Sequence, residues 1–157
     1  MADLVLDVGA LADLLSQYFQ AEDRTRPLFE PSRFLSSEIA RQINRIVRDD
    51  GRYIVAASAM AFVELVRKWD EIVDQRFEPY QLAAFLQDPP DWFSLEPVDE
   101  DLIPLFGQVP PEVPMPDGSV QTLEWPDVIH AATALSREEA DLITSDGRLL
   151  QVMALQA

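Results

Sequence analysis

The sequence contains no cysteine and a single histidine, His130, among its 157 residues. The lack of cysteine excludes disulfides, thiol catalysis and zinc sites built on thiolates, and one histidine excludes histidine-rich metal sites. Long apolar runs are missing too. None approaches the roughly 18 residues that cross a bilayer, and the start lacks the basic-then-apolar pattern of a signal peptide. We therefore expect a cytoplasmic protein that does not use a membrane.

Basic residues are scarce in the second half of the chain. Residues 1–76 carry 10 Lys and Arg against 13 Asp and Glu, whereas residues 77–157 carry 2 against 15, and the net charge is −16. Nucleic-acid binding usually relies on a basic surface that releases counterions from phosphates. A polyanion should therefore approach the N-terminal half, and the second half would repel it or contact a basic protein partner.

Apolar segments alternate with segments of helical periodicity along the chain. The sequence predicts strands at 4–6, 53–57, 92–95 and 140–145, an edge strand at 152–155, and helices at 9–19, 38–47, 58–74, 80–86 and 125–135. Nine of the twelve prolines lie between residues 89 and 126, which predicts a Pro-rich loop at about 104–124. We predict one domain over residues 1–157, an α/β fold with a three-layer α/β/α sandwich and a mainly parallel central sheet.

Four acidic residues are placed where a parallel sheet would bring them together. Asp7 and Asp146 follow predicted strands, Glu64 lies in an apolar stretch after another strand, and Asp127 opens a helix after Pro126. Sites in such folds gather beyond the carboxyl ends of the strands. Carboxylates that converge there repel one another unless a cation joins them, and oxygen ligands suit Mg²⁺ or Mn²⁺. These four residues are therefore predicted as both metal ligands and catalytic residues.

The predicted chemistry is metal-assisted hydrolysis of a phosphodiester. A divalent cation would position the phosphate and activate water, so the reaction needs neither histidine nor a covalent intermediate. Such a reaction normally leaves a 5′ phosphate and a 3′ hydroxyl. Asp3 and Asp141 lie at the opposite ends of the same strands and should have no part in it.

Each acidic residue also has a purely structural interpretation. Asp7 could cap the next helix, and Glu64 could pair with Lys68. Asp127, in the first turn of its helix, could interact favourably with the helix dipole, and Asp146 could belong to a turn. The case for a site rests on the four together. It fails if their oxygens point apart, or if a cationic side chain of the chain itself fills the place.

Four segments resemble the PIN-domain ribonucleases, a family that includes the VapC-like toxins of toxin–antitoxin modules. They are Val5-Leu6-Asp7, Ala59 to Leu65 with its Glu64, Trp125 to Ala134 with Asp127, and Leu142 to Asp146. They span nearly the whole chain in the family's order, and the last two are the most specific.

The resemblance implies a compact α/β/α sandwich that cuts RNA with Mg²⁺ or Mn²⁺ held by the four carboxylates. It also implies that Thr144 supports the site, and it suggests an antitoxin protein and a second copy of the chain as partners. Where the family usually has Thr or Ser after the first Asp, this chain has Val8-Gly9. The alternative is therefore a PIN-like protein with weak or no catalysis that serves as a protein-interaction module.

Substrate contacts are predicted at basic residues of the N-terminal half. Arg41, Arg45 and Arg48 recur on the polar side of the second helix and could follow a phosphate backbone, although a solvated helical face is the ordinary reading. His130, one turn after Asp127, could point toward substrate or simply pack. Three arginines of the preceding loop are further candidates: Arg24, Arg26 and Arg33.

Overall fold

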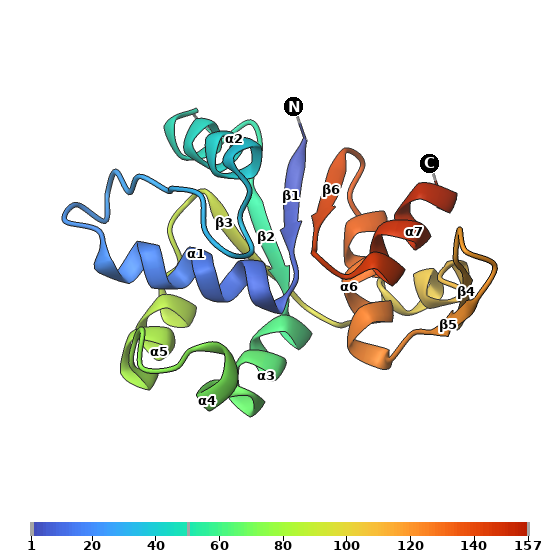
Figure 1. The fold of residues 1–157 in the computed structure, drawn as a ribbon. Helices are drawn as coiled ribbons and strands as arrows, with labels where there is room; N and C mark the ends of the chain where they lie inside the picture. Colours follow the sequence, from blue (N-terminus) through green and yellow to red (C-terminus); the bar gives the residue numbers. More distant parts are fainter. Residues whose placement is uncertain (1, 50, 157) are drawn as a thin grey trace.

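A four-stranded parallel sheet forms the centre of the molecule (Figure 1). The computed structural model describes residues 2–49 and 51–156. The strands are β1 (Asp3–Leu6), β2 (Val55–Ser58), β3 (Phe93–Glu96) and β6 (Ala140–Ile143), in the spatial order β3-β2-β1-β6. β1 pairs with β2 on one side and with β6 on the other. The predicted α/β class and parallel sheet are thus confirmed.

Helices cover both faces of this sheet, an arrangement compatible with a three-layer sandwich. The helices are α1 (Val8–Gln20), α2 (Ser37–Arg48), α3 (Ala59–Arg67), α4 (Trp69–Ile72), α5 (Pro79–Gln87), α6 (Trp125–Leu135) and α7 (Gly147–Gln156). Side-chain caps start several of them as the sequence predicts. Ser36 Oγ accepts from the Ile39 amide at 3.1 Å, and Ser58 Oγ accepts from the Ala61 amide at 3.1 Å.

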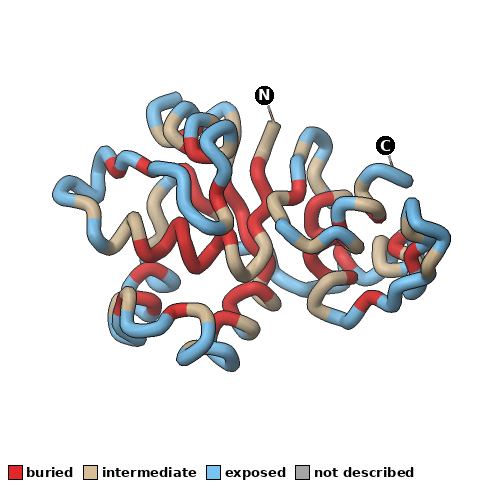
Figure 2. Tube along the Cα trace, viewed as in Figure 1, coloured by how far each residue is buried: buried red, intermediate tan, exposed pale blue. Residues whose placement is uncertain are grey.

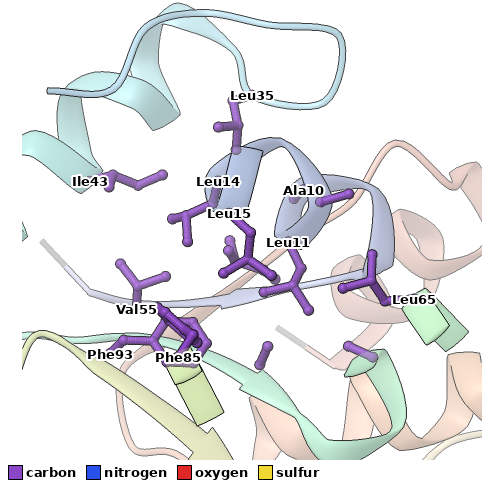
Figure 3. Close-up of a cluster of buried hydrophobic side chains, with 14 of the residues drawn as sticks. Ala10, Leu11, Leu14, Leu15, Leu35, Ile43, Val55, Leu65, Phe85 and Phe93 are labelled. Carbon is purple, nitrogen blue, oxygen red and sulfur yellow. The ribbon is translucent and has the colours of Figure 1, made fainter. Parts of the chain in front are cut away.

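The two faces of the sheet bury different halves of the core. Because side chains alternate along a strand, Leu4 and Leu6 pack with α1, while Val5 packs with α6 and α7. Figure 2 shows the buried residues running through the strands and along α1. Figure 3 shows the larger cluster, in which Leu11 and Leu15 of α1 lie over the sheet. Because both faces of the sheet are covered, the polar side chains next to these strands lie at the strand ends.

Two predicted elements differ in the structure. The edge strand expected at 152–155 is wrong, because this segment belongs to α7, whose Leu149 and Val152 lie three residues apart and are both buried. The helix expected over 58–74 is divided at Lys68 into α3 and α4.

The Pro-rich segment has more order than a loop. It contains the 3₁₀ helix η1 (Ile103–Gln108) and an antiparallel pair, β4 (Glu112–Pro114) and β5 (Val120–Thr122), outside the central sheet. In the part of the chain that the structure describes, no helix is both long and apolar enough to cross a bilayer.

A buried acid that the sequence analysis did not single out secures the long loop before α2. Asp13 of α1 is 3% exposed, and its carboxylate accepts hydrogen bonds from the Ser32 hydroxyl at 2.6 Å and the Phe34 amide at 2.8 Å. It also pairs with Arg76 at 2.8 Å. One carboxylate therefore joins α1, the loop and the segment after α4.

Replacing this carboxylate should destabilise the fold. In Asp13→Ala the Phe34 amide and the Arg76 guanidinium lose their acceptor, which should cost about 2–3 kcal/mol. Chemical denaturation of this variant beside Glu22→Ala, an exposed acid in the following loop, measures the difference. Equal stability of the two variants would contradict this role for Asp13.

Candidate functional site

The parallel pairing of β1 with β6 brings two of the predicted acids to one edge. Leu6 is in register with Ile143, and the Asp7 amide donates to the Ile143 carbonyl at 3.1 Å. Asp7 therefore lies beside Thr144, whose side chain hydrogen-bonds its carboxylate. Thr144 Oγ1 also accepts from the Asp146 amide at 3.0 Å. The hydroxyl thus connects Asp7 with the backbone of Asp146.

Asp127 and Asp146 converge on the guanidinium of Arg148. Arg148 Nη2 lies 2.6 Å from Asp146 Oδ2 and 3.1 Å from Asp127 Oδ2. Arg148 Nε donates to Asp146 Oδ1 at 3.1 Å, so the pair with Asp146 uses both carboxylate oxygens. A single cation thus joins two acids that are 19 residues apart in the sequence.

Glu64 approaches the acidic site from α3 and is hydrogen-bonded to His130. His130 Nε2 lies 2.6 Å from Glu64 Oε1, and His130 Nδ1 lies 3.2 Å from Ser58 Oγ. With Nε2 donating to the carboxylate and Nδ1 accepting from the hydroxyl, both ring nitrogens have partners. The alternative pairing of Glu64 with Lys68 does not form, since Glu64 turns inward to the histidine.

Burial and mutual repulsion raise two of the carboxyl pKa values. Burial chiefly raises the pKa of Asp7, and the charge of Glu64 adds to this, while the Ala10 amide and Thr144 oppose it. Burial also chiefly raises the pKa of Asp127, with repulsion from Asp146, and the charge of Arg148 opposes it. By contrast, hydrogen bonds from Arg148 lower the pKa of Asp146. Burial, more than repulsion between the acids, therefore makes ionisation of Asp7 and Asp127 less favourable.

The donor types suit a hard cation, but their arrangement in the structure does not. Carboxylate oxygens are the ligands that Mg²⁺ and Mn²⁺ prefer. Yet among residues 2–49 and 51–156 no three acids or histidines stand together in a way that could hold a metal ion. Arg148 forms ion pairs with the carboxylates of Asp127 and Asp146, and His130 contacts the carboxylate of Glu64. The site predicted from the sequence required that no cationic side chain of the chain itself lie between the four acids. Arg148 lies between Asp127 and Asp146, so this requirement is not met for two of the four.

The structural interpretations of the acids also hold in part. Asp7 caps α1, since its Oδ1 accepts from the Ala10 amide at 3.0 Å. Asp127 Oδ2 accepts from the Glu124 amide at 3.4 Å in the first turn of α6. Capping fixes these carboxylates at the sheet edge, but it does not account for their burial together.

The predicted substrate residues on α2 lie at the wrong end of the sheet. Arg45 lines a hollow with Ala2 and residues 138–141, next to the amino ends of β1 and β6. Figure 1 shows α2 near the N-terminus, away from the end of β1 where α1 begins. Arg41 pairs with Glu38, and Arg48 donates to the Asn44 carbonyl. Arg41, Arg45 and Arg48 therefore have no contact with the acidic site, because the helix that carries them packs at the opposite edge.

His130 is likewise not placed for contact with substrate. Its side chain is 2% exposed, because α6 packs against the sheet and α3 with this face inward. The structure agrees better with the alternative that His130 is packed in the core. Its ring also orients Glu64.

A basic residue that does approach the site comes from the loop before α2. Arg33 lines a cavity of about 550 Å³ together with Asp7, Gly9, Phe34 and Ser145. Its guanidinium lies over the Phe34 ring, 4.8 Å from the centroid. The Phe34 ring also packs closely on Gly9, where an added side-chain carbon would lie 3.0 Å from the ring and force it to shift. Gly9 therefore has a packing reason.

The sequence analysis missed Arg148 altogether. Its signal was nevertheless present, since Arg137 and Arg148 are the two basic residues of the strongly acidic second half. Arg148 lies two residues after Asp146, a predicted metal ligand, and this spacing could have indicated an ion pair between them.

Comparisons with family models, with curated proteins and with solved structures give no significant match to this chain. The resemblance to the PIN-domain family therefore stays a prediction from the sequence.

Removing the charge of Asp7 should stabilise the protein. Because the folded state raises this pKa, ionised Asp7 costs stability above that pKa, and the cost disappears once pH falls below the unfolded value near 3.8. Asp7→Asn keeps a good helix cap and should melt higher at pH 7, by roughly 2–4 °C for each 1 kcal/mol relieved.

Thermal unfolding without added metal, at pH 7 and near pH 3.5, measures this gain. It should shrink at the lower pH, and Asp91→Asn, an exposed acid, should show no such gain. A lower melting temperature for Asp7→Asn at pH 7 would contradict the account.

Proposed function

We propose that this protein is a metal-dependent endoribonuclease of PIN-like fold, with Asp7, Glu64, Asp127 and Asp146 as its catalytic acids. The observation that supports this most is the position of Asp7 and Asp146 at the carboxyl ends of the neighbouring strands β1 and β6, with Asp127 next to Asp146 through their shared contact with Arg148. Partial burial raises the pKa values of Asp7 and Asp127, and perturbed carboxyl groups at this end of a parallel sheet are candidates for a functional site. The oxygen-only donor set favours Mg²⁺ or Mn²⁺ as the cofactor.

The residues of the chain have separate roles in this proposal. Asp127 and Asp146 are the natural cation ligands, because their oxygens already converge on one positive group. Asp7, with its raised pKa, is the carboxylate best suited to take a proton from attacking water. His130 is a positioning residue, since it holds Glu64 from a buried place. A bound divalent cation would supply charge stabilisation to the phosphate undergoing hydrolysis.

RNA would reach Asp7 through the cavity that Arg33 lines. This cavity joins the start of α1 to the loop before α2, both in the half of the chain with nearly balanced charge. Arg33 can contact a phosphate while its plane stays on Phe34. The cytoplasmic location, an antitoxin-type protein partner and a homodimer remain predictions that follow from composition and resemblance.

The second candidate is a PIN-like protein-interaction module without useful catalysis. The ion pairs of Arg148 with two of the four acids favour it, since a site neutralised by its own chain needs no metal. The acidic second half would then bind a basic partner. The two candidates differ in one cheap observable, the response to a divalent cation.

Cleavage of single-stranded RNA with Mn²⁺ or Mg²⁺ tests the proposal. Fragments with 5′ phosphate and 3′ hydroxyl ends should form, and a chelator should stop the reaction. Asp127→Asn should lower the rate at least about 100-fold, since even residues that only support metal ligands cost 10–100-fold. Asp141→Asn, at the opposite end of β6, is the matched control. If no cation causes cleavage or raises the melting temperature, the interaction module is the better account.

Loss of Arg33 should weaken RNA binding without abolishing it. Arg33→Gln removes one phosphate contact, so the slope of log affinity against log salt should fall by about 0.7 for a single strand. The measurement uses Asp127→Asn as background, so that RNA stays intact. Arg41→Gln, at the other end of the sheet, should bind RNA as its parent does. Equal losses in both variants would remove the proposed RNA path.

A further inference from the structure

An apolar groove lies between η1, the ends of the β4–β5 hairpin and the start of α6. It has a volume of about 280 Å³, and all six of its lining residues are apolar: Phe106, Val109, Pro111, Leu123, Trp125 and Val128. The Leu123 amide donates to the Pro111 carbonyl at 2.9 Å, which holds the two ends of the hairpin together. The groove is therefore built from three segments that are fixed to one another.

The floor of this groove belongs to the core, whereas one wall is open to solvent. Val109, Leu123 and Val128 are buried, but Trp125 is 68% exposed even though its ring packs edge-on against Phe106, with 6.1 Å between the ring centroids. An exposed tryptophan beside an apolar hollow is typical of an interaction surface, because aromatic residues often carry much of the binding energy there. The groove thus suits a large apolar side chain of another molecule.

Acidic residues surround the groove. Residues 77–136 contain 11 Asp and Glu and no Lys or Arg. Glu112 and Glu124 are exposed and directly adjoin lining residues in the chain. Arg148 approaches from the side of β5, but it is already paired with two carboxylates of the acidic site. The rim of the groove is therefore negatively charged.

We infer that this groove is a docking site for a cationic segment of a partner protein. One large apolar side chain of that segment enters the hollow, and flanking Lys or Arg residues face the acidic rim. The charge decides between the possible occupants, because a second copy would bring the same acids to the interface, and RNA or an anionic membrane would be repelled. The inference goes beyond the proposed function, since the six lining residues include none of the four predicted catalytic acids.

Synthetic peptides serve as the probe. The first set has lysines on both sides of a central Trp or Leu, the second has a central Gly, and the third has glutamates in place of the lysines. Calorimetry with the whole chain should show that the first set binds at least about tenfold more tightly than the second, because its apolar side chain is buried. Added salt should weaken this binding. Lack of binding by the first set at roughly 1 mM peptide, or equal binding of the third, would overturn the inference.

Trp125→Ala tests the apolar part of the groove. It should lower the affinity for the first set at least about tenfold, as expected of an aromatic residue at the centre of a binding site. Tyr80→Ala is the matched control, because Tyr80 is an exposed aromatic residue in the first turn of α5, which lies on the opposite side of the molecule from the β4–β5 hairpin (Figure 1). Equal losses of affinity in the two variants would contradict a docking site in the groove.

Glu112→Lys tests the acidic rim. Asp91→Lys changes the net charge by the same amount, but Asp91 lines a different hollow, beside Tyr18 and Trp92. We expect Glu112→Lys to weaken binding of the first set more than Asp91→Lys does, because Glu112 adjoins the groove and screening limits the effect of distant charges. Equal effects would mean that net charge alone attracts the peptides, and the inference would be wrong.

Two measurements complete the test. In the parent protein, a lysine peptide with a central Leu should shift the NMR amide resonances of Leu123, Trp125 and Val128 and leave those of α5 unchanged. Shifts that spare the groove would overturn the inference even if Trp125→Ala does not fold. Sedimentation should give the same oligomeric state for the parent and Trp125→Ala. A dimer that Trp125→Ala dissociates would assign the groove to a second copy and would also overturn the inference.

Discussion

Partial burial of carboxylates dominates the electrostatics at the carboxyl edge of the sheet. Parallel pairing of β1 with β6 fixes Asp7 and Asp146 at this edge, and α3 and α6 bring Glu64 and Asp127 to the same region. Burial makes each negative charge costlier, which raises the pKa values of Asp7 and Asp127. Arg148 compensates the charges of Asp127 and Asp146, and His130 contacts the carboxylate of Glu64. Each of these three acids therefore has a basic partner.

Arg148 supplies the positive charge between Asp127 and Asp146, and it also attaches the β4–β5 hairpin. In a strongly acidic chain with two Lys or Arg residues in its second half, few other side chains could take this role.

Much of the fold could be predicted from the sequence, because local signals and packing agree there. The short apolar runs before Asp7 and Asp146 form adjacent parallel strands, and Ser36 and Ser58 cap their helices as expected. The C-terminal segment was wrong, since a few apolar residues suit a strand and a buried helical face equally well. The strand ends also placed Asp7 and Asp146 next to each other, whereas in the described residues no three of the acids stand together as a metal-holding group.

Side-chain partners could not be predicted in the same way. The partner of Glu64 proved to be His130 on another helix, and Arg148 bridges residues from separate elements. Such pairings depend on how helices pack across the sheet, which periodicity does not specify. The α2 arginines show the same limit: their spacing placed them on one face, but packing placed that helix at the far edge of the sheet.

The central claim is the proposal that this acidic edge binds a divalent cation. Anomalous diffraction from crystals grown with Mn²⁺ tests it most directly. The account predicts an anomalous peak in contact with Asp127 and Asp146. Crystals in which Mn²⁺ gives no peak there, and Arg148 still bridges the two carboxylates, would contradict it.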